Sequence, residues 1–180
     1  MPNPAETNTR QALVLFSSII SMHALSPRET MVYREVPSGA RGFRQIAIEQ
    51  GGTLKVEYLD SDAWGTTVDQ FHLTPVVRVG DLVFISGASG GSHSADPEEQ
   101  FTAAFQDIAD TLAAVGVGWD EVVKMTTYHQ GGLRQNLDLL LQVKDRFVRP
   151  PYPAWTGVGV TELANPHALI EIDVIAVVTA

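Results

Sequence analysis

The chain has 180 residues, 44% of them hydrophobic and 18% charged, and a formal net charge of −9. This size and composition suit one folded domain with an apolar core, and the acidic balance argues against nucleic acid as a partner because phosphate backbones would be repelled. The absence of cysteine excludes disulfides, thiolate zinc sites and cysteine nucleophiles.

An apolar run near the N-terminus, Ala12–Leu25, is too short to span a bilayer, so we expect no membrane partner. Three interpretations stay open for it. It could be a helix with one apolar face, a signal-peptide core behind Arg10, or the product of translation assigned from too early a start, since Met22 and Met31 follow. We expect a cytoplasmic protein, with export only if residues 12–25 act as a signal.

Residues 1–70 indicate a partly irregular N-terminal extension, because glycines interrupt the pattern repeatedly. Two short runs within it predict strands, at Gln45–Glu49 and Leu54–Leu59. From residue 71 onward the pattern is that of a compact domain. Its first two strands are predicted at Val76–Val79 and Leu82–Ser86, and the Gly-Asp pair between them is typical of a hairpin turn.

A helix is predicted to begin after Asp96, an N-cap residue, with Pro97 at its first position and Glu99 closing a capping box. Apolar residues then recur at helical spacing and give the helix one apolar face, namely Phe101, Ala104, Phe105, Ile108, Leu112 and Val115. Gly116 suits the end of the helix.

The rest of the domain alternates between strand and helix patterns. We predict a strand over Glu121–His129, an amphipathic helix over Arg134–Phe147, and final strands over Trp155–Thr161 and Ala168–Val178. The apolar face of that helix is expected to comprise Leu137, Leu140, Leu141, Lys144 and Phe147. This order predicts an α+β fold, a mixed β-sheet with two helices on one face. The last strand is apolar on both sides, which indicates burial of both faces. We therefore expect the second face to pack on a partner subunit of a homo-oligomer.

Four segments of the compact domain carry a family resemblance: VRVGDLVFISG, LAAVGVGWDEVVKMTTYH, PPYPAWTGVGV and IEIDVIA. They resemble the RidA family, also called YjgF, and the third segment is most similar to its YjgH-like branch. The resemblance implies a chorismate-mutase-like fold for residues 71–180 and a homotrimer with three ligand clefts between subunits. It also implies hydrolysis of reactive enamines and imines, in which an Arg holds the substrate carboxylate, a Glu positions water, and a Ser and a Tyr lie near the ligand.

Carried over residue by residue, this family pattern is incomplete. The Glu falls on Glu171 and the Ser on Ser86, beside Gly87, but the Arg position holds Trp155 and the Tyr position, near Leu73, is unmatched. A guanidinium binds a carboxylate through two parallel N–H groups, whereas indole has one donor and a stacking face. We therefore expect a pocket without the carboxylate clamp of the family.

Each candidate residue has a functional and a structural interpretation. Glu171 could be a general base with a raised pKa or a carboxylate held by backbone donors. Trp155 could line a ligand pocket or pack in a subunit interface. His129, at a strand end, is the candidate acid or base. Ser86 and Thr156 are ligand contacts or ordinary strand residues. No metal-ligand spacing or phosphate-loop motif occurs, so we expect no metal and no cofactor.

These residues support two functions for a small-molecule ligand. The first is hydrolysis of a nitrogen-bearing electrophile, with Glu171 activating water and with Ser86, His129 and Trp155 shaping the pocket. The second is a non-catalytic ligand-binding or regulatory trimer that uses the same clefts. RNA cleavage, a third function linked to the family, is disfavoured by the acidic balance.

Overall fold

The computed structural model describes residues 29–35, 43–50, 54–61, 70–90 and 94–178. The described residues form eight strands and two α-helices: β1 (Glu29–Glu35), β2 (Phe43–Gln50), β3 (Leu54–Ser61), β4 (Val76–Val79), β5 (Leu82–Ala88), α2 (Pro97–Ala114), β6 (Val122–Gln130), α3 (Leu137–Lys144), β7 (Ala154–Val160) and β8 (Ile170–Val177). Two short 3-10 helices, Trp119–Glu121 and Leu133–Gln135, precede β6 and α3.

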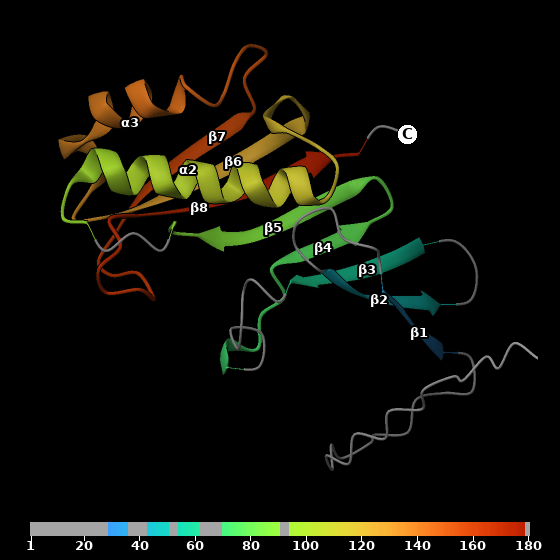
Figure 1. Cartoon of the computed structure of the whole chain (residues 1–180). Helices are drawn as coiled ribbons and strands as arrows, with labels where there is room; N and C mark the ends of the chain where they lie inside the picture. Colours follow the sequence, from blue (N-terminus) through green and yellow to red (C-terminus); the bar gives the residue numbers. More distant parts are fainter. Residues whose placement is uncertain (1–28, 36–42, 51–53, 62–69, 91–93, 179–180) are drawn as a thin grey trace, which may run out of the picture.

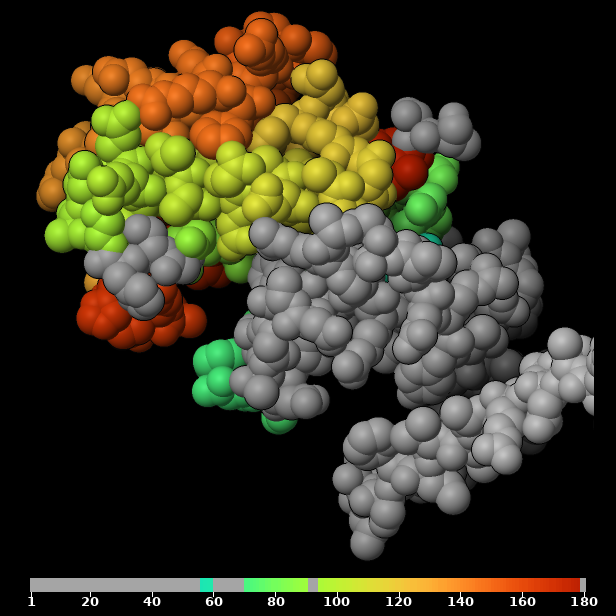
Figure 2. Space-filling model, viewed as in Figure 1, coloured from blue at the N-terminus to red at the C-terminus, as the bar shows by residue number. Residues whose placement is uncertain are grey.

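All eight strands belong to one mixed sheet in the order β1-β2-β3-β4-β5-β8-β6-β7. Neighbouring strands run antiparallel except β6 and β7, which are parallel because α3 carries the chain back between them. Figure 1 shows α2 and α3 side by side over the same face of the sheet. In the space-filling view the two helices form one continuous surface (Figure 2). The predicted mixed sheet with two helices on one face is therefore confirmed.

The hydrophobic core lies between α2 and the sheet. Phe101, Phe105, Ile108 and Leu112 come from one stripe of α2 and are at most 1% exposed. They pack in the same cluster as the strand residues that alternate toward the helices, namely Val83, Ile85, Met125, Ile170, Ile172 and Val174. Helical spacing in α2 and alternation in the strands thus point their apolar residues at each other.

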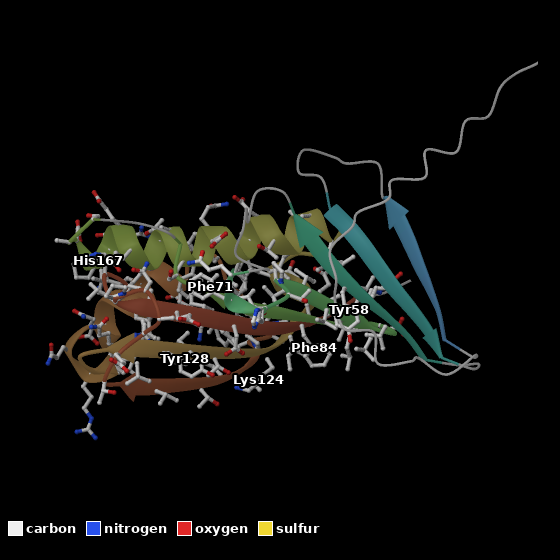
Figure 3. All side chains as sticks on the ribbon, turned by 90° about the horizontal axis from the view of Figure 1, so that it is seen from below. Tyr58, Phe71, Phe84, Lys124, Tyr128 and His167 are labelled. Atoms are coloured by element: carbon white, nitrogen blue, oxygen red, sulfur yellow. The ribbon has the colours of Figure 1, made fainter. Side chains whose placement is uncertain are left out.

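The face of the sheet away from the helices, which we call the open face, is only half covered. On β5 the buried Val83 and Ile85 alternate with Leu82 and Phe84, which are 40% and 39% exposed. Figure 3 shows Phe84 on the side of the sheet away from α2. The open-face residues of β8 are half-buried. Burial of both faces of β8, which the sequence predicts, is thus partial within one chain.

The ends of α2 follow the predicted capping with one exception. Asp96 is the N-cap, and its Oδ1 accepts a hydrogen bond from Glu98 N at 2.9 Å. The predicted capping box with Glu99 is wrong, because the N–H of Asp96 donates to Ser94 Oγ instead. At the other end Gly116 has φ +82°, a conformation that glycine commonly adopts just after a helix. The N–H groups of Gly116 and Val117 donate to the carbonyls of Ala113 and Leu112 in the last turn.

Several element boundaries differ from the sequence prediction. The second helix is shorter than predicted because the first residues of that segment form the 3-10 helix Leu133–Gln135. Leu141, expected in its apolar face, is 38% exposed, and Val143 is buried instead. Strand β1 was not predicted, although β2 and β3 were. The predicted helix or signal at residues 12–25 lies outside the described residues.

Gln100 ties the start of α2 to the chain that leads into β8. It is 3% exposed, and its Nε2 donates to Ser94 O at 2.6 Å and to His167 O at 3.0 Å. Its Oε1 accepts from Leu169 N at 2.8 Å. One amide therefore satisfies three backbone groups from two segments that are far apart in the sequence, and it positions the strand that carries Glu171.

We expect Gln100→Ala to lower the free energy of unfolding by about 2–4 kcal/mol, because it leaves buried backbone groups without partners. Urea denaturation monitored by circular dichroism measures this change. Gln106→Ala is the matched control, since Gln106 is exposed and its Nε2 donates to Asp110 Oδ1 on its own helix. We expect a cost below about 0.5 kcal/mol for the control. Equal costs for the two variants would show that the bridge is not structural.

Candidate functional site

A β-bulge in β5 brings the backbone of Gly87 against the side chain of Glu171. Ile85 pairs with Val174 and Ala88 with Ile172, so β5 contains one residue more than β8 between these two pairs. A Cβ built on Gly87 would lie 2.0 Å from Glu171 Oε1. Only glycine leaves room for the carboxylate at this distance, so the position of Glu171 requires Gly87.

Glu171 belongs to a group of three ionisable side chains on the open face, which we call the Glu171 cluster: Tyr128, Glu171 and Asp173. Tyr128 pairs directly with Glu171 across β6 and β8. Burial, and then the charge of Asp173, raise the pKa of Glu171. Burial also raises the pKa of Tyr128, followed by the charge of Asp173 and a hydrogen bond to it. The cluster thus holds a carboxylate that gains a proton more readily than usual beside a phenol that keeps its own.

The two predicted hydroxyl contacts lie at different ends of the site. Ser86 Oγ donates to Thr74 O at 2.8 Å, so its proton is already used within the chain. Thr156 is exposed on β7, where its Oγ1 accepts from Lys124 Nζ at 3.0 Å. Thr156 pairs with Thr126, which pairs in turn with Asp173, so the register places Thr156 on the open face two strands from Glu171. Figure 3 shows Lys124 and Tyr128 on this same face.

Trp155 and His129 lie on the opposite, helix-covered face and share one hydroxyl. Trp155 Nε1 donates to Thr127 Oγ1 at 2.9 Å, and His129 Nε2 lies 2.9 Å from the same oxygen. Thr127 is fully buried and His129 is 2% exposed, with its ring edge-on to Phe101 of α2. Burial lowers the pKa of His129 from 6.5 to about 4. His129 is therefore neutral near pH 7.

Lys144 of α3 lies over the Trp155 ring of this group. Its Nζ lies 4.1 Å from the centroid of the Trp155 ring and 5.8 Å from that of Tyr152. Lys144 is 7% exposed, which is rare for a lysine, and burial lowers its pKa. A cation therefore stacks on the indole that stands at the Arg position of the family pattern.

Within one chain the predicted site residues thus form two groups on opposite faces of the sheet. Glu171, Gly87 and Thr156 face the open side, and Trp155 and His129 face the helices. The prediction that His129 acts as an acid or base consequently concerns the Trp155 side and not the Glu171 side. Sequence reasoning did not single out Tyr128, Asp173, Thr127 or Lys144 as site residues. Alternation along TTYH and IEID was the signal for the first three, since it separates the residues of the two faces.

The described residues hold no group of three or more histidines and carboxylates placed to bind a metal ion. The same part of the chain has no helix with the length and apolarity needed to cross a membrane.

Comparison with known proteins identifies the class to which this fold and site belong. The family described as Endoribonuclease L-PSP matches residues 69–178. Over 111 residues the chain is 39% identical to the RutC family protein YjgH of Escherichia coli K12, which covers 59% of this chain and 83% of that protein. The chain therefore belongs to the RidA (YjgF) family, and it is YjgH-like.

Two solved structures place this similarity in three dimensions. The structure of YjgH gives a TM-score of 0.56 at 34% identity and covers 63% of this chain and 88% of YjgH. The structure of E. coli TdcF with bound serine gives a TM-score of 0.53 at 23% identity, over 59% of this chain and 88% of TdcF, which shows the shared fold alone. Strands β1 to β3 precede the residues that the family matches.

The neutral state of His129 predicts a pH dependence of stability. The folded chain binds this proton only near pH 4, whereas an unfolded histidine binds it near 6.5, so stability is lost as the pH falls between these values. We expect His129→Gln to remove up to ~3 kcal/mol of this loss, measured as the free energy of unfolding in urea at several pH values. The exposed His167, changed to Gln, is the control. If the stability of His129→Gln depends on pH as steeply as that of the wild-type protein, the prediction is contradicted.

Proposed function

We propose that this chain is a small-molecule hydrolase of the deaminase type, which acts on a reactive nitrogen-bearing metabolite in clefts between the subunits of a cytoplasmic homotrimer. The observation that carries the proposal is the Glu171 carboxylate, which lies against the Gly87 backbone with its pKa raised by burial and by Asp173. A carboxylate whose pKa is closer to neutral can take a proton from water and return it within one turnover.

The chemistry that Glu171 would perform is the addition of water to a C=N bond. Glu171 takes a proton from water while the water oxygen bonds to the imine carbon, and the C=N electron pair moves to nitrogen, which takes up a proton from solvent. As the C=O bond of the carbinolamine reforms, its hydroxyl proton returns to solvent and the C–N bond breaks, and the nitrogen leaves as ammonia with the proton held by Glu171. An imine and water thus become a carbonyl compound and ammonia, with no oxidant or cofactor required.

The placement of the site residues on two faces of the sheet supports a shared cleft. Trp155 and Glu171 point to opposite sides in one chain, so a pocket that uses both must combine residues of two subunits. The open face supports such an assembly, because Leu82 and Phe84 are 40% and 39% exposed there and a partner would cover them. The trimer of the proposal rests on this uncovered face together with membership of the family.

The Trp155 side of the cleft defines the proposed substrate class. Without an arginine the pocket lacks the paired donors that read a carboxylate, and the indole N–H is already donated to Thr127. Imines made from ordinary amino acids are therefore disfavoured relative to uncharged or apolar ones.

A non-catalytic ligand-binding trimer is the alternative function. It is favoured by the donors of Ser86 and Trp155, which are both used inside the chain rather than free for a substrate. The family description names an endoribonuclease, but a net charge of −9 opposes binding of a phosphate backbone, so we do not extend that activity to this chain.

For the hydrolase we expect Glu171→Gln to lower kcat/KM for an uncharged imine by about 10²- to 10⁴-fold, because the amide cannot accept a proton from water. Ammonia release measures the rate, and thermal unfolding checks that the variant folds. Glu162→Gln, an exposed carboxylate outside the site, is the control and should leave the rate unchanged. A wild-type protein that is stabilised by ligands yet releases no ammonia from any imine would favour the binding alternative.

We expect no measurable hydrolysis of 2-aminoacrylate by the wild-type protein, because the carboxylate clamp is missing. Trp155→Arg should restore some ammonia release from it. The new guanidinium would meet the Lys144 ammonium, 4.1 Å from the indole it replaces, so Trp155→Arg combined with Lys144→Gln should restore more. Rapid turnover of 2-aminoacrylate by the wild-type protein would refute the substrate class, and two inactive variants would point to the missing Tyr instead.

A further inference from the structure

The three strands that precede the family-matched residues have one apolar face. β3 joins the sheet at β4, where Tyr58 pairs with Val77 and Val77 pairs in turn with Phe84. Tyr58 therefore lies in one cross-strand row with Phe84 on the open face (Figure 3). This row and the parallel row through Val56 continue across β2 and β1, and their positions on the three strands are all apolar or aromatic: Met31, Tyr33, Ile46, Ile48, Val56 and Tyr58. We call these six positions the apolar block.

The other face of the same strands is mostly polar, and on β3 it is satisfied within the chain. Its polar and charged positions are Thr30, Arg34, Gln45, Glu49, Lys55 and Glu57. Leu59 packs against the hydrophobic core. Glu57 is 7% exposed, and its Oε2 lies 3.8 Å from Nε of Arg78, the residue that pairs with it on β4. The apolar block is therefore the face of these strands that needs a cover.

The two described helices do not supply that cover, because α2 and α3 both lie over the opposite face of the sheet (Figure 1). Val56 and Tyr58 of the block are half-buried, as are Val77 and Val79 beside them on β4. A sheet buries an apolar face against a second layer of structure. From β1 to β3 the block is about 10 Å wide, which is close to the diameter of one helix with its side chains. One helix is therefore wide enough to cover it.

The chain carries an apolar segment directly before β1. As a helix, residues 12–25 place four apolar residues on one side, namely Leu13, Phe16, Ile20 and Ala24. Residues 26–28 then lead to β1, and Pro27 among them ends a helix. Connections of this length commonly join a helix to a strand of the sheet on which it packs. A helix over residues 12–25 is about 21 Å long, and the seven-residue β1 is about 23 Å long.

We propose that residues 12–25 form a helix that packs on the apolar block and supplies the second layer over β1 to β3. The N-terminal segment is then part of the folded protein and not a signal that is removed. Because the helix covers β1 to β3, Leu82 and Phe84 on β5 stay available to a partner subunit. The inference goes beyond the proposed function, since it uses neither Glu171 nor any other site residue.

Hydrogen exchange of the full chain, followed by mass spectrometry, tests the docked helix. We expect the amides of residues 12–25 to exchange about tenfold or more slowly than those of an unfolded chain. Ile20→Asp should abolish this protection, because it would bury a charge against the apolar block. Ser18→Asp is the matched control, since a helix places position 18 on the opposite side from position 20.

A second pair of variants tests the sheet side of the contact. Ile46→Ser changes the apolar block and should also abolish the protection of residues 12–25. Gln45→Ser, at the neighbouring position of β2 and on the other face, should keep it. If Ile46→Ser does not fold, as judged by its thermal unfolding, the comparison of Ile20→Asp with Ser18→Asp decides alone.

The outcomes separate the helix from other occupants of the block. Protection that is the same at every protein concentration, and that is lost in Ile20→Asp but kept in Ser18→Asp, supports the proposal. Exchange of residues 12–25 in the wild-type protein at the rate of an unfolded chain overturns it, and so does an equal effect of the two substitutions. Protection that appears only as light scattering reports a larger assembly overturns it in favour of a second copy.

The intact mass of the protein isolated from its own cells tests the signal interpretation. A chain that has lost residues 1–25 would overturn the proposal, and a chain that retains them supports it. None of these measurements depends on ammonia release, so the docked helix and the proposed hydrolase can fail independently of each other.

Discussion

The close approach of the Glu171 carboxylate to the Gly87 backbone is the constraint on which the site depends. It requires a strand residue without a Cβ, an extra residue in β5 that turns this position outward, and a β8 register that points the carboxylate at it. It also removes water from one side of the carboxylate, which contributes to the raised pKa of Glu171. A local irregularity in an otherwise regular sheet thus creates the chemical property of the site.

The sheet separates two kinds of chemistry that the sequence places close together. On the open face, carboxylates and a phenol interact at the surface, where proton transfer to and from water is possible. On the helix-covered face, a neutral histidine and an indole share one threonine hydroxyl, and a buried ammonium lies over the indole ring. Residues adjacent in the chain, such as Tyr128 and His129, consequently belong to different environments.

The fold was largely predictable from the sequence, because helical spacing in α2 and alternation in β5 and β8 report burial directly. Residues that contact one another through register were not predictable, since pairing Tyr128 with Glu171 requires knowing that β6 lies beside β8. Lys144 was placed in an apolar helix face by its spacing, but its ring contacts come from a later segment of the chain. The sequence did not predict β1, because its apolar centre is short and lies between the polar end residues Glu29 and Glu35.

The shared hydroxyl of Thr127 has an evolutionary consequence. Thr127 holds the indole N–H, the indole holds the ammonium of Lys144, and each group would be poorly accommodated if its neighbour changed alone. Substitutions at positions 127, 144 and 155 should therefore occur together during evolution rather than independently. With tryptophan at position 155, a change to arginine is selected against, because the guanidinium would lie beside the Lys144 ammonium.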